Sequence, residues 1–369
     1  MKRLVFIQYP NPLNPHSHGG MAVSMHEVLK RLSRDYQVEV HTGYLGDKTG
    51  SCNLDGVRYI HYAIGTGRWP NRASFSWRST SANWQAADLT VIPWSRYAPV
   101  FLRQKHAPAV IELHADYFST PSQCPALEPL AKALLLQAVR KSGHVICVSQ
   151  AVKKEVLKRT GSNLHSEVIY NGLPEDLFKA DTTPAAEYLL FVGRLDIRGK
   201  GLDLLLQAYK HSQVKLPMVI AGDGADRARL ELLISELGLS DKVTLPGWLA
   251  GPAKWEVMRR AAAVVVPSIS EGFGLTALEA SGLGRPVIAS EVGGLKEIVR
   301  NGETGLLVQP SIEALSAAMQ TIVNSREQAE AMGKTGAAFA ADFTWDKAVK
   351  ARVAFYQEAI ELSQAARQN

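Results

Sequence analysis

Short apolar runs alternate with stretches of helical periodicity along the whole chain. In the first 173 residues the runs that predict β-strands are Arg3–Gln8, Val38–His41, Val57–Tyr62, Leu89–Ile92, Ala109–Leu113, Val145–Val148 and Glu167–Tyr170. The clearest helical stretches among them are Gly20–Leu32, Ala126–Arg140 and Gln150–Arg159. Strands that alternate with helices are typical of parallel sheets covered by helices. The pattern therefore predicts an α/β fold.

The alternation breaks once and then starts again. A turn is predicted at residues 171–174 (NGLP), and residues 181–184 (DTTP) have the composition of a linker. The strands of the second series are predicted at Tyr188–Val192, Leu216–Ala221, Val243–Leu245, Ala262–Val266, Pro286–Ala289 and Leu306–Val308. A chain of 369 residues is too long for one core. We therefore expect two α/β domains, one after the other.

The composition is that of an ordinary globular enzyme, with 46% hydrophobic and 21% charged residues. The three cysteines (Cys52, Cys124 and Cys147) are odd in number and widely spaced, which argues against a disulfide framework or a zinc site and favours a reducing cytoplasm. The apolar run at the N-terminus is short and ends at prolines, so it predicts a first strand rather than a signal peptide. No run approaches the ~20 apolar residues of a membrane span.

The most informative motif is the run EGFGLTALE at residues 271–279, which follows a predicted strand. Its two glycines, Gly272 and Gly274, let a ligand approach the backbone, and the helix that begins near Leu275 offers free N–H groups to an anion. Glu271 lies in the turn and Glu279 lies within the helix. Such a site suits a ligand with phosphates at one end and hydroxyls at the other, as in a nucleotide sugar.

This run resembles the E-x7-E signature of the retaining glycosyltransferases of family 4. The segments GRPVIA (284–289), GG (293–294) and NGETGLLV (301–308) are similar to that family as well. The resemblance implies that Glu271 holds sugar hydroxyls and Glu279 ribose hydroxyls, with Gly272, Phe273, Gly274 and Leu275 as further donor-binding residues. The alternative is that both glutamates are solvated acids without a ligand.

The resemblance also implies the fold called GT-B, in which two Rossmann-like domains face each other. The expected domains are an acceptor-binding domain at 1–176, a nucleotide-sugar domain at 177–345, and a C-terminal helix at 346–369 that returns to the first domain. We expect the chain to turn back at Trp345.

Two cations follow the first predicted strand of the second series. The strand ends at Gly193, Arg194 comes next, and Lys200 follows six residues later, just before a predicted helix. Arg194 can bind two phosphate oxygens at once and Lys200 can act as a point charge. The resemblance implies that both bind the diphosphate of the donor and stabilise it as the leaving group. Two surface cations without a ligand are the alternative.

The segment AGDG at 221–224 also follows a strand, and the resemblance implies that Gly224 lines the nucleotide site. A purely structural turn is the alternative. The acids Asp223 and Asp226 lack the D-x-D spacing of a metal motif. We therefore expect the cations to replace a metal, with no cofactor, because the nucleotide sugar is a substrate.

In the first half, Gly19 and Gly20 open a predicted helix after a loop that contains His16 and His18. The resemblance implies that the glycines face the donor phosphates and the acceptor. His16, His18 and Asp116 are candidates for contact with the acceptor, and for the two histidines the alternative is that they are polar loop residues. His114 follows the strand Ala109–Leu113, where polar residues of parallel sheets lie near ligands. The resemblance implies that His114 contacts the donor sugar. A structural histidine is the alternative.

Charge is distributed unevenly. Residues 1–173 carry 20 Lys and Arg against 11 Asp and Glu, a net charge of +9, and the remainder carries 21 against 24, a net charge of −3. Residues 68–78 interleave Trp69 and Trp77 with Arg68, Arg72 and Arg78, a composition suited to a bilayer interface. We therefore expect an anionic acceptor or peripheral association with an anionic membrane. A solvated face with core tryptophans is the alternative.

Together these features predict a cytoplasmic retaining glycosyltransferase. It would move a hexose or N-acetylhexosamine from a UDP sugar, with GDP as second choice, to a glycan or lipid-linked acceptor in polysaccharide, lipopolysaccharide or glycolipid synthesis. A transferase with a small soluble acceptor, a sugar-nucleotide epimerase and a glycoside hydrolase remain as alternatives. A basic nucleic-acid-binding protein is disfavoured, because no RNA-binding aromatic motif or helix-turn-helix pattern occurs.

Overall fold

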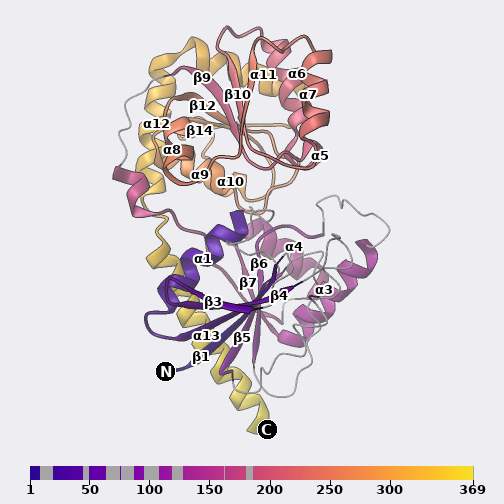
Figure 1. The fold of residues 1–369 in the computed structure, drawn as a ribbon, viewed down its shortest axis with the longest axis vertical. Coiled ribbons are helices and arrows are strands. Elements are labelled where there is room, and N and C mark those ends of the chain that lie inside the picture. The colour runs from indigo at the N-terminus through magenta and orange to yellow at the C-terminus, as the bar shows by residue number, and fades with distance from the viewer. Residues whose placement is uncertain are drawn as a thin grey trace. The chain divides into compact units, whose positions relative to one another are not determined.

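A computed structural model describes residues 1–8, 20–44, 50–63, 75, 87–94, 108–118, 128–161, 163–179 and 186–368. The chain divides into two compact units (Figure 1). The first unit contains Met1–Gly172 together with Trp345–Asn369, and the second contains Leu173–Thr344. Each has one sheet and helices around it, so the α/β, two-domain Rossmann-like fold expected from the sequence is confirmed.

The sheet of the first unit has eight strands in its described part, in the order β3-β4-β2-β1-β5-β6-β7-β8. Their bounds are Arg3–Gln8 (β1), Gln37–Tyr44 (β2), Gly50–Leu54 (β3), Val57–Ala63 (β4), Leu89–Pro93 (β5), Ala109–Leu113 (β6), His144–Cys147 (β7) and His165–Val168 (β8). Only the pairing of β3 with β4 is antiparallel within these strands. The edge strand β3 was not expected, because its sequence GSCNL is mostly polar and half exposed.

The helices of the first unit within the described ranges are α1 (Gly20–Leu32), α3 (Glu128–Ser142), α4 (Gln150–Thr160) and α13 (Trp345–Gln368). The last of these packs into the core of the first sheet. Trp345, Phe355 and Tyr356 of α13 lie in one buried cluster with Leu4 and Phe6 of β1. The final segment of the chain therefore belongs structurally to its first half (Figure 1).

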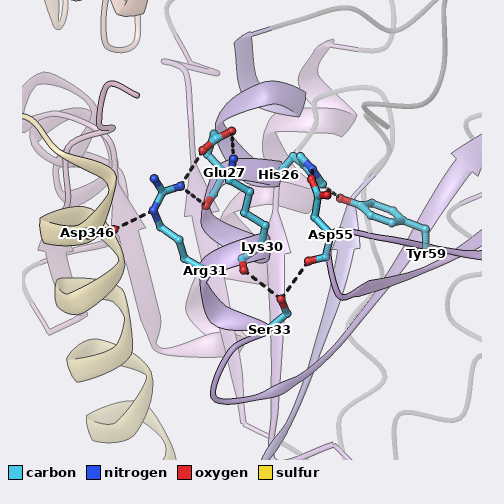
Figure 2. A network of polar contacts seen from close by, with 8 residues as sticks. All are labelled: His26, Glu27, Lys30, Arg31, Ser33, Asp55, Tyr59 and Asp346. Carbon is cyan, nitrogen blue, oxygen red and sulfur yellow. Dashed lines mark hydrogen bonds and ion pairs between the residues drawn. The ribbon is translucent and has the colours of Figure 1, made fainter. Parts of the chain in front are cut away.

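Polar contacts fix α1 on two sides (Figure 2). His26 bonds the Tyr59 hydroxyl at 2.8 Å and the Asp55 carboxylate at 2.9 Å, which ties the helix to the β3–β4 hairpin. On the other side Arg31 donates to Asp346 of α13 at 2.8 Å. These contacts hold the helix whose first residue is Gly20, one of the expected donor-binding positions.

The second unit has a parallel sheet in the order β11-β10-β9-β12-β13-β14. Its strands are Tyr188–Val192 (β9), Met218–Ala221 (β10), Val243–Gly247 (β11), Ala261–Val266 (β12), Val287–Ser290 (β13) and Gly305–Val308 (β14). Its helices are the 3-10 helix η3 (Glu175–Lys179), α5 (Ile197–Lys200), α6 (Leu202–Ser212), α7 (Arg227–Glu236), α8 (Gly251–Arg259), α9 (Leu275–Gly282), α10 (Leu295–Ile298), α11 (Ile312–Asn324) and α12 (Arg326–Ala340).

The order of the second sheet reverses between β9 and β12, which are adjacent and parallel. In open α/β sheets, ligands bind beyond the carboxyl ends of the strands at such a reversal. The chain leaves β9 into Gly193 and Arg194, and it leaves β12 into the loop that carries Glu271. The motifs singled out in the sequence therefore meet at the point where the topology favours a ligand.

No helix in the described ranges combines the length and the apolar character needed to cross a bilayer.

Candidate functional site

The loop between β12 and α9 folds tightly because of its glycines. Gly274 has a positive φ of 101° and precedes α9, and no side chain caps this helix start. The first N–H groups of α9 are therefore available to an anionic ligand. Gly293 passes so close that a Cβ there would lie 2.0 Å from the Glu271 carbonyl oxygen. That approach, together with the bond from the Gly294 N–H to the same oxygen, fixes the backbone of Glu271.

The Glu271 carboxylate lies between a cation and a hydroxyl. Its Oε2 atom accepts from Lys200 Nζ at 2.7 Å and from the Ser268 hydroxyl at 3.1 Å. The side chains of Lys200 and Glu271 are 26% and 18% exposed, so the pair lies partly open to solvent. Oε1 has no hydrogen-bond partner among the described residues and is available to a ligand hydroxyl. Lys200 is therefore paired with Glu271 and partly shielded from solvent.

Lys200 reaches Glu271 because of the short helix α5. Asp196 starts this helix by accepting from the Gly199 N–H at 3.0 Å. Gly201 ends it in the left-handed conformation, and a Cβ there would lie 2.2 Å from the Pro267 carbonyl oxygen. The Ile269 N–H then donates to the Gly199 carbonyl at 3.2 Å. The loops after β9 and β12 are thus locked together, with Lys200 between them.

Arg194 is exposed and forms no ion pair with any residue that the structure describes. Gly193 precedes it and donates its N–H to the Ala221 carbonyl at 3.0 Å. Gly224 also serves the packing of these loops, since a Cβ there would lie 2.4 Å from the Leu195 carbonyl oxygen. The close approach that Gly224 permits in the structure is between two backbone segments, and Arg194 is a cation at this edge without an ion pair among the described residues.

Glu279 lies on α9 and is buried, with a relative exposure of 7%. Both of its carboxylate oxygens accept from Lys254 Nζ, at 2.6 and 2.8 Å. Lys254 comes from α8, a helix that the sequence analysis did not connect to the motif. The signal was weak because the two residues lie 25 positions apart and no local pattern relates them.

The remaining residues of the motif have different environments. Phe273 is buried at 4% exposure, so it contributes a core side chain, and Gly272 is buried beside it. Leu275 is half-buried and is the first residue of α9. Asp226, near the segment tested for a metal motif, accepts from the Ile197 N–H at 2.9 Å. Within the described residues no group of three His, Cys, Asp or Glu side chains could hold a metal ion.

In the first unit, His114 lies beside a buried acid. Its Nε2 atom is 3.4 Å from Glu112 Oε2, and its side chain is 5% exposed. Glu112 also contacts Arg352 of α13 at 3.4 Å, and both of those side chains are fully buried. The Tyr356 hydroxyl donates to the same carboxylate. Sequence reasoning missed this cluster, because Glu112 and Arg352 are 240 positions apart.

The groups around Glu112 determine the protonation state of its carboxyl group. Burial has the largest single effect and raises the pKa of the Glu112 carboxyl, and the charge of Arg352 is the strongest influence that acts against it. The nearby His114 and the hydrogen bond from Tyr356 act in the same direction as Arg352, and together these groups lower the pKa from 4.5 to about 2. Glu112 is therefore an anion at neutral pH, and His114 lies next to a fixed negative charge.

The structure describes only some of the other site residues expected in the first unit. Gly20 is the exposed first residue of α1. Asp116 accepts from the Phe118 N–H at 2.9 Å, so its carboxylate closes a local turn. His16, His18 and Gly19, together with residues 68–74 and 76–78, lie outside the described residues. Trp94 is buried at 1% exposure and belongs to the core rather than to a surface.

Two family models match the chain and together span residues 18 to 339. The model "Glycosyltransferase Family 4" matches residues 18–177, and the model "Glycosyl transferases group 1" matches residues 174–339. A D-inositol 3-phosphate glycosyltransferase of Mycobacterium avium is 31% identical over 308 residues, which is 78% of this chain and 69% of that protein. An uncharacterized glycosyltransferase of Methanocaldococcus jannaschii is 32% identical over 224 residues, 60% of this chain and 61% of that protein.

Solved structures share the fold. Sucrose-phosphate synthase from Thermosynechococcus elongatus superimposes with a TM-score of 0.81 at 23% identity and covers 100% of this chain and 99% of its own. HepE of Anabaena, solved in complex with UDP-glucose, gives a TM-score of 0.75 at 20% identity, with 99% and 100% coverage. At these identities the likeness establishes a common fold.

Proposed function

The chain belongs to glycosyltransferase family 4, and on that premise we propose that it is a retaining, metal-independent transferase that takes a hexose or N-acetylhexosamine from a nucleotide sugar. The observation that carries the proposal is the carboxyl edge of the second sheet. At this edge α9 begins without a side-chain cap, Lys200 is paired with Glu271, and the exposed Arg194 follows the end of β9. Glu279 supplies a second carboxylate on α9. This arrangement offers positive charge to a diphosphate and acceptors to hydroxyl groups.

In the proposed reaction the bond between C1 of the sugar and the diphosphate oxygen breaks, and that oxygen takes the electron pair. Arg194, Lys200 and the N–H groups of α9 stabilise the charge that gathers on the leaving group. The acceptor hydroxyl attacks C1 from the same face, and its proton passes to the departing phosphate. Glu271 holds sugar hydroxyls through its unpaired Oε1, Glu279 holds ribose hydroxyls, and His114 contacts the sugar.

We favour UDP as the nucleotide of the donor and place GDP second. Support for UDP comes from the Anabaena protein of the same fold, which was solved with UDP-glucose. In this proposal the cations replace a metal ion at the diphosphate, because Arg194 and Lys200 bring two positive charges to the helix start of α9.

Two classes of acceptor are in competition. The basic first half, with its net charge of +9, favours an anionic glycan or lipid-linked acceptor in polysaccharide, lipopolysaccharide or glycolipid synthesis. A small phosphorylated acceptor is the second candidate, favoured by the Mycobacterium avium relative that is named a D-inositol 3-phosphate glycosyltransferase. Both acceptors are anionic, so both agree with the charge of the first half.

We also propose a cytoplasmic enzyme that associates peripherally with the membrane. Each basic residue near an anionic surface contributes about 1 kcal/mol, so a few arginines bind reversibly. Sedimentation with vesicles tests this proposal. Binding to anionic vesicles alone, weakened by high salt and by changing Arg68, Arg72 and Arg78 to Ala, is expected. No binding to either vesicle type would favour the small acceptor.

A panel of UDP-, GDP- and ADP-sugars tests the donor. Because a ligand that binds only the folded state at 100 times its Kd stabilises it by about 2.7 kcal/mol, the right nucleotide should raise the Tm clearly. We expect the largest rise with a UDP sugar. Product analysis then separates a transferase from an epimerase, which would return an altered nucleotide sugar, and from a hydrolase, which would act without an acceptor. A panel in which no nucleotide sugar binds would refute the proposal.

A further inference from the structure

Lys254 of α8 and Glu279 of α9 form an ion pair in which both carboxylate oxygens take part. The Lys254 ammonium donates to both oxygens of Glu279, at 2.6 and 2.8 Å, whereas Lys200 contacts one oxygen of Glu271. The Glu279 side chain is 9% exposed and that of Lys254 is 21% exposed. Charge-assisted bonds of this length in a partly dry environment hold a carboxylate in one orientation.

The pairing leaves Glu279 able to accept further hydrogen bonds. A carboxylate offers about four lone-pair sites on its two oxygens. Lys254 occupies one site on each oxygen, and no other described residue has a hydrogen bond to the Glu279 carboxylate. The only other hydrogen bond from a described loop or cap residue goes to the Glu279 backbone carbonyl, from the Leu283 N–H. One site on each carboxylate oxygen therefore remains for a ligand, at a fixed spacing. Two neighbouring hydroxyl groups of one ring have the number and type of donors that such a carboxylate accepts.

The position of Glu279 along α9 fits this ligand. Glu279 lies four residues after Leu275, so both are on the same face of the helix, about 6 Å apart along its axis. A phosphate at the helix start and a ribose one turn further along would lie next to each other, as they do in a nucleoside diphosphate. Lys254 reaches this place from the separate helix α8.

We infer that Lys254 is a positioning residue that orients Glu279 toward the two ribose hydroxyls of the nucleotide. The inference rests on the proposed function, since it requires a nucleotide at this edge. Lys254 would not touch the nucleotide in this role. It would act through Glu279, and it would set the preference for ribose over deoxyribose.

The competing explanation is that the Lys254–Glu279 ion pair is a brace, a contact that only holds α8 against α9. The positioning role and the brace make different predictions. Loss of a brace weakens the binding of every nucleotide by the same factor. Loss of a positioning residue weakens the binding of the ribonucleotide while leaving the deoxynucleotides nearly unaffected. The dissociation constant of the deoxynucleotide divided by that of the ribonucleotide therefore distinguishes the two explanations.

The experiment measures the Kd of UDP, 2′-deoxy-UDP and 3′-deoxy-UDP by calorimetry, with GDP and its deoxy forms in parallel. The variants are Lys254→Met, which removes the charge, and Lys254→Arg, which restores it. Lys254→Gln is a milder change in case the Met variant folds poorly. Lys242→Met is the matched control, because Lys242 is exposed and precedes β11 at the opposite edge of the same sheet.

In the wild type, loss of one hydroxyl should weaken binding by about 10- to 100-fold, the scale of a hydrogen bond to a charged group. We expect this ratio to fall to about threefold or less in Lys254→Met, to recover in large part in Lys254→Arg, and to be unchanged in Lys242→Met. An unchanged ratio in Lys254→Met, at whatever affinity, would overturn the positioning role.

Two results in the wild type would also overturn the inference. Binding of UDP or GDP without discrimination against the deoxy forms would refute ribose recognition by Glu279 while leaving the proposed transferase intact. Binding of neither nucleotide would refute the proposed function itself.

Discussion

The ion pairs of the two units differ in how deeply they are buried. At the carboxyl edge of the second sheet, Lys200 and Glu271 are 26% and 18% exposed, and Lys254 contacts a glutamate that is 9% exposed. In the first unit, Glu112 and Arg352 are both fully buried. A partly exposed ion pair can exchange one partner for a ligand at a modest cost in free energy. Removal of one partner from a fully buried pair, by contrast, causes a large loss of stability. In our proposal the first arrangement serves binding, whereas the second stabilises the fold.

The largest effect is expected from opening the buried pair. Arg352→Met should lower the free energy of unfolding by about 3–5 kcal/mol, because it leaves the Glu112 carboxylate buried without its cation. Urea unfolding measures this loss. The exposed pair between Arg326 and Glu330 on α12 provides the control. Arg326→Met should cost less than about 1 kcal/mol, and equal losses in the two variants would contradict the distinction between the units.

The next largest effect concerns turnover. Lys200→Ala should lower turnover by about 10²- to 10³-fold, the scale for loss of one group that stabilises developing charge. Stability should fall little, because the pair is partly exposed and Ser268 still donates to Glu271.

Arg198→Ala provides the control for Lys200→Ala, because Arg198 is an exposed cation on the same short helix. Steady-state kinetics with a nucleotide-sugar donor should separate the two variants. If Lys200→Ala turns over at the wild-type rate with donor binding intact, Lys200 has no part in leaving-group stabilisation.

A third prediction concerns acid stability. Arg352, His114 and Tyr356 together outweigh the effect of burial and lower the pKa of Glu112 from 4.5 to about 2 in the folded protein. The unfolded chain therefore binds the proton more readily, and the contribution of Glu112 to stability is complete above pH 4.5 and is lost as the pH falls toward 2. Unfolding free energies measured between pH 5 and 2 should show this loss in the wild type. In Glu112→Gln the slope over this window should be smaller, and an equal slope would contradict the assignment.

The smallest expected effect is that of a chelator. Since two cations and the start of α9 face the diphosphate in the proposed site, EDTA should leave the transfer rate within about twofold. Rate measurements before and after dialysis against EDTA test this expectation. Activity that disappears and returns with manganese or magnesium would show that the cations do not suffice.

The sequence indicated much of the second unit because its signals are local. Strand β9 at Tyr188–Val192 matches its predicted bounds, and the turn at Gly274 followed by α9 was expected from glycine spacing. Glycines reveal tight turns, and short apolar runs reveal buried parallel strands. The sequence did not indicate what each glycine approaches. Gly224 was expected to line the nucleotide site, which stays a prediction, and the structure adds that a Cβ there would lie 2.4 Å from the Leu195 carbonyl oxygen.

The missed features depend on contacts between distant residues. Lys254 and Arg352 look like ordinary helix cations in the sequence, and only the packing of their helices brings them to Glu279 and Glu112. The edge strand β3 was missed for a different reason. It pairs on one side only and needs few apolar residues, so it leaves no alternating pattern.

The central claim is that a nucleoside diphosphate binds at the carboxyl edge of the second sheet, and amide hydrogen exchange tests it most directly. Exchange is measured residue by residue with and without saturating UDP, and in parallel with GDP. The account predicts slower exchange at the Leu275, Thr276 and Ala277 amides at the start of α9, with unchanged exchange in the β3–β4 hairpin. Protection elsewhere in the chain, with these three amides unaffected, would contradict the account.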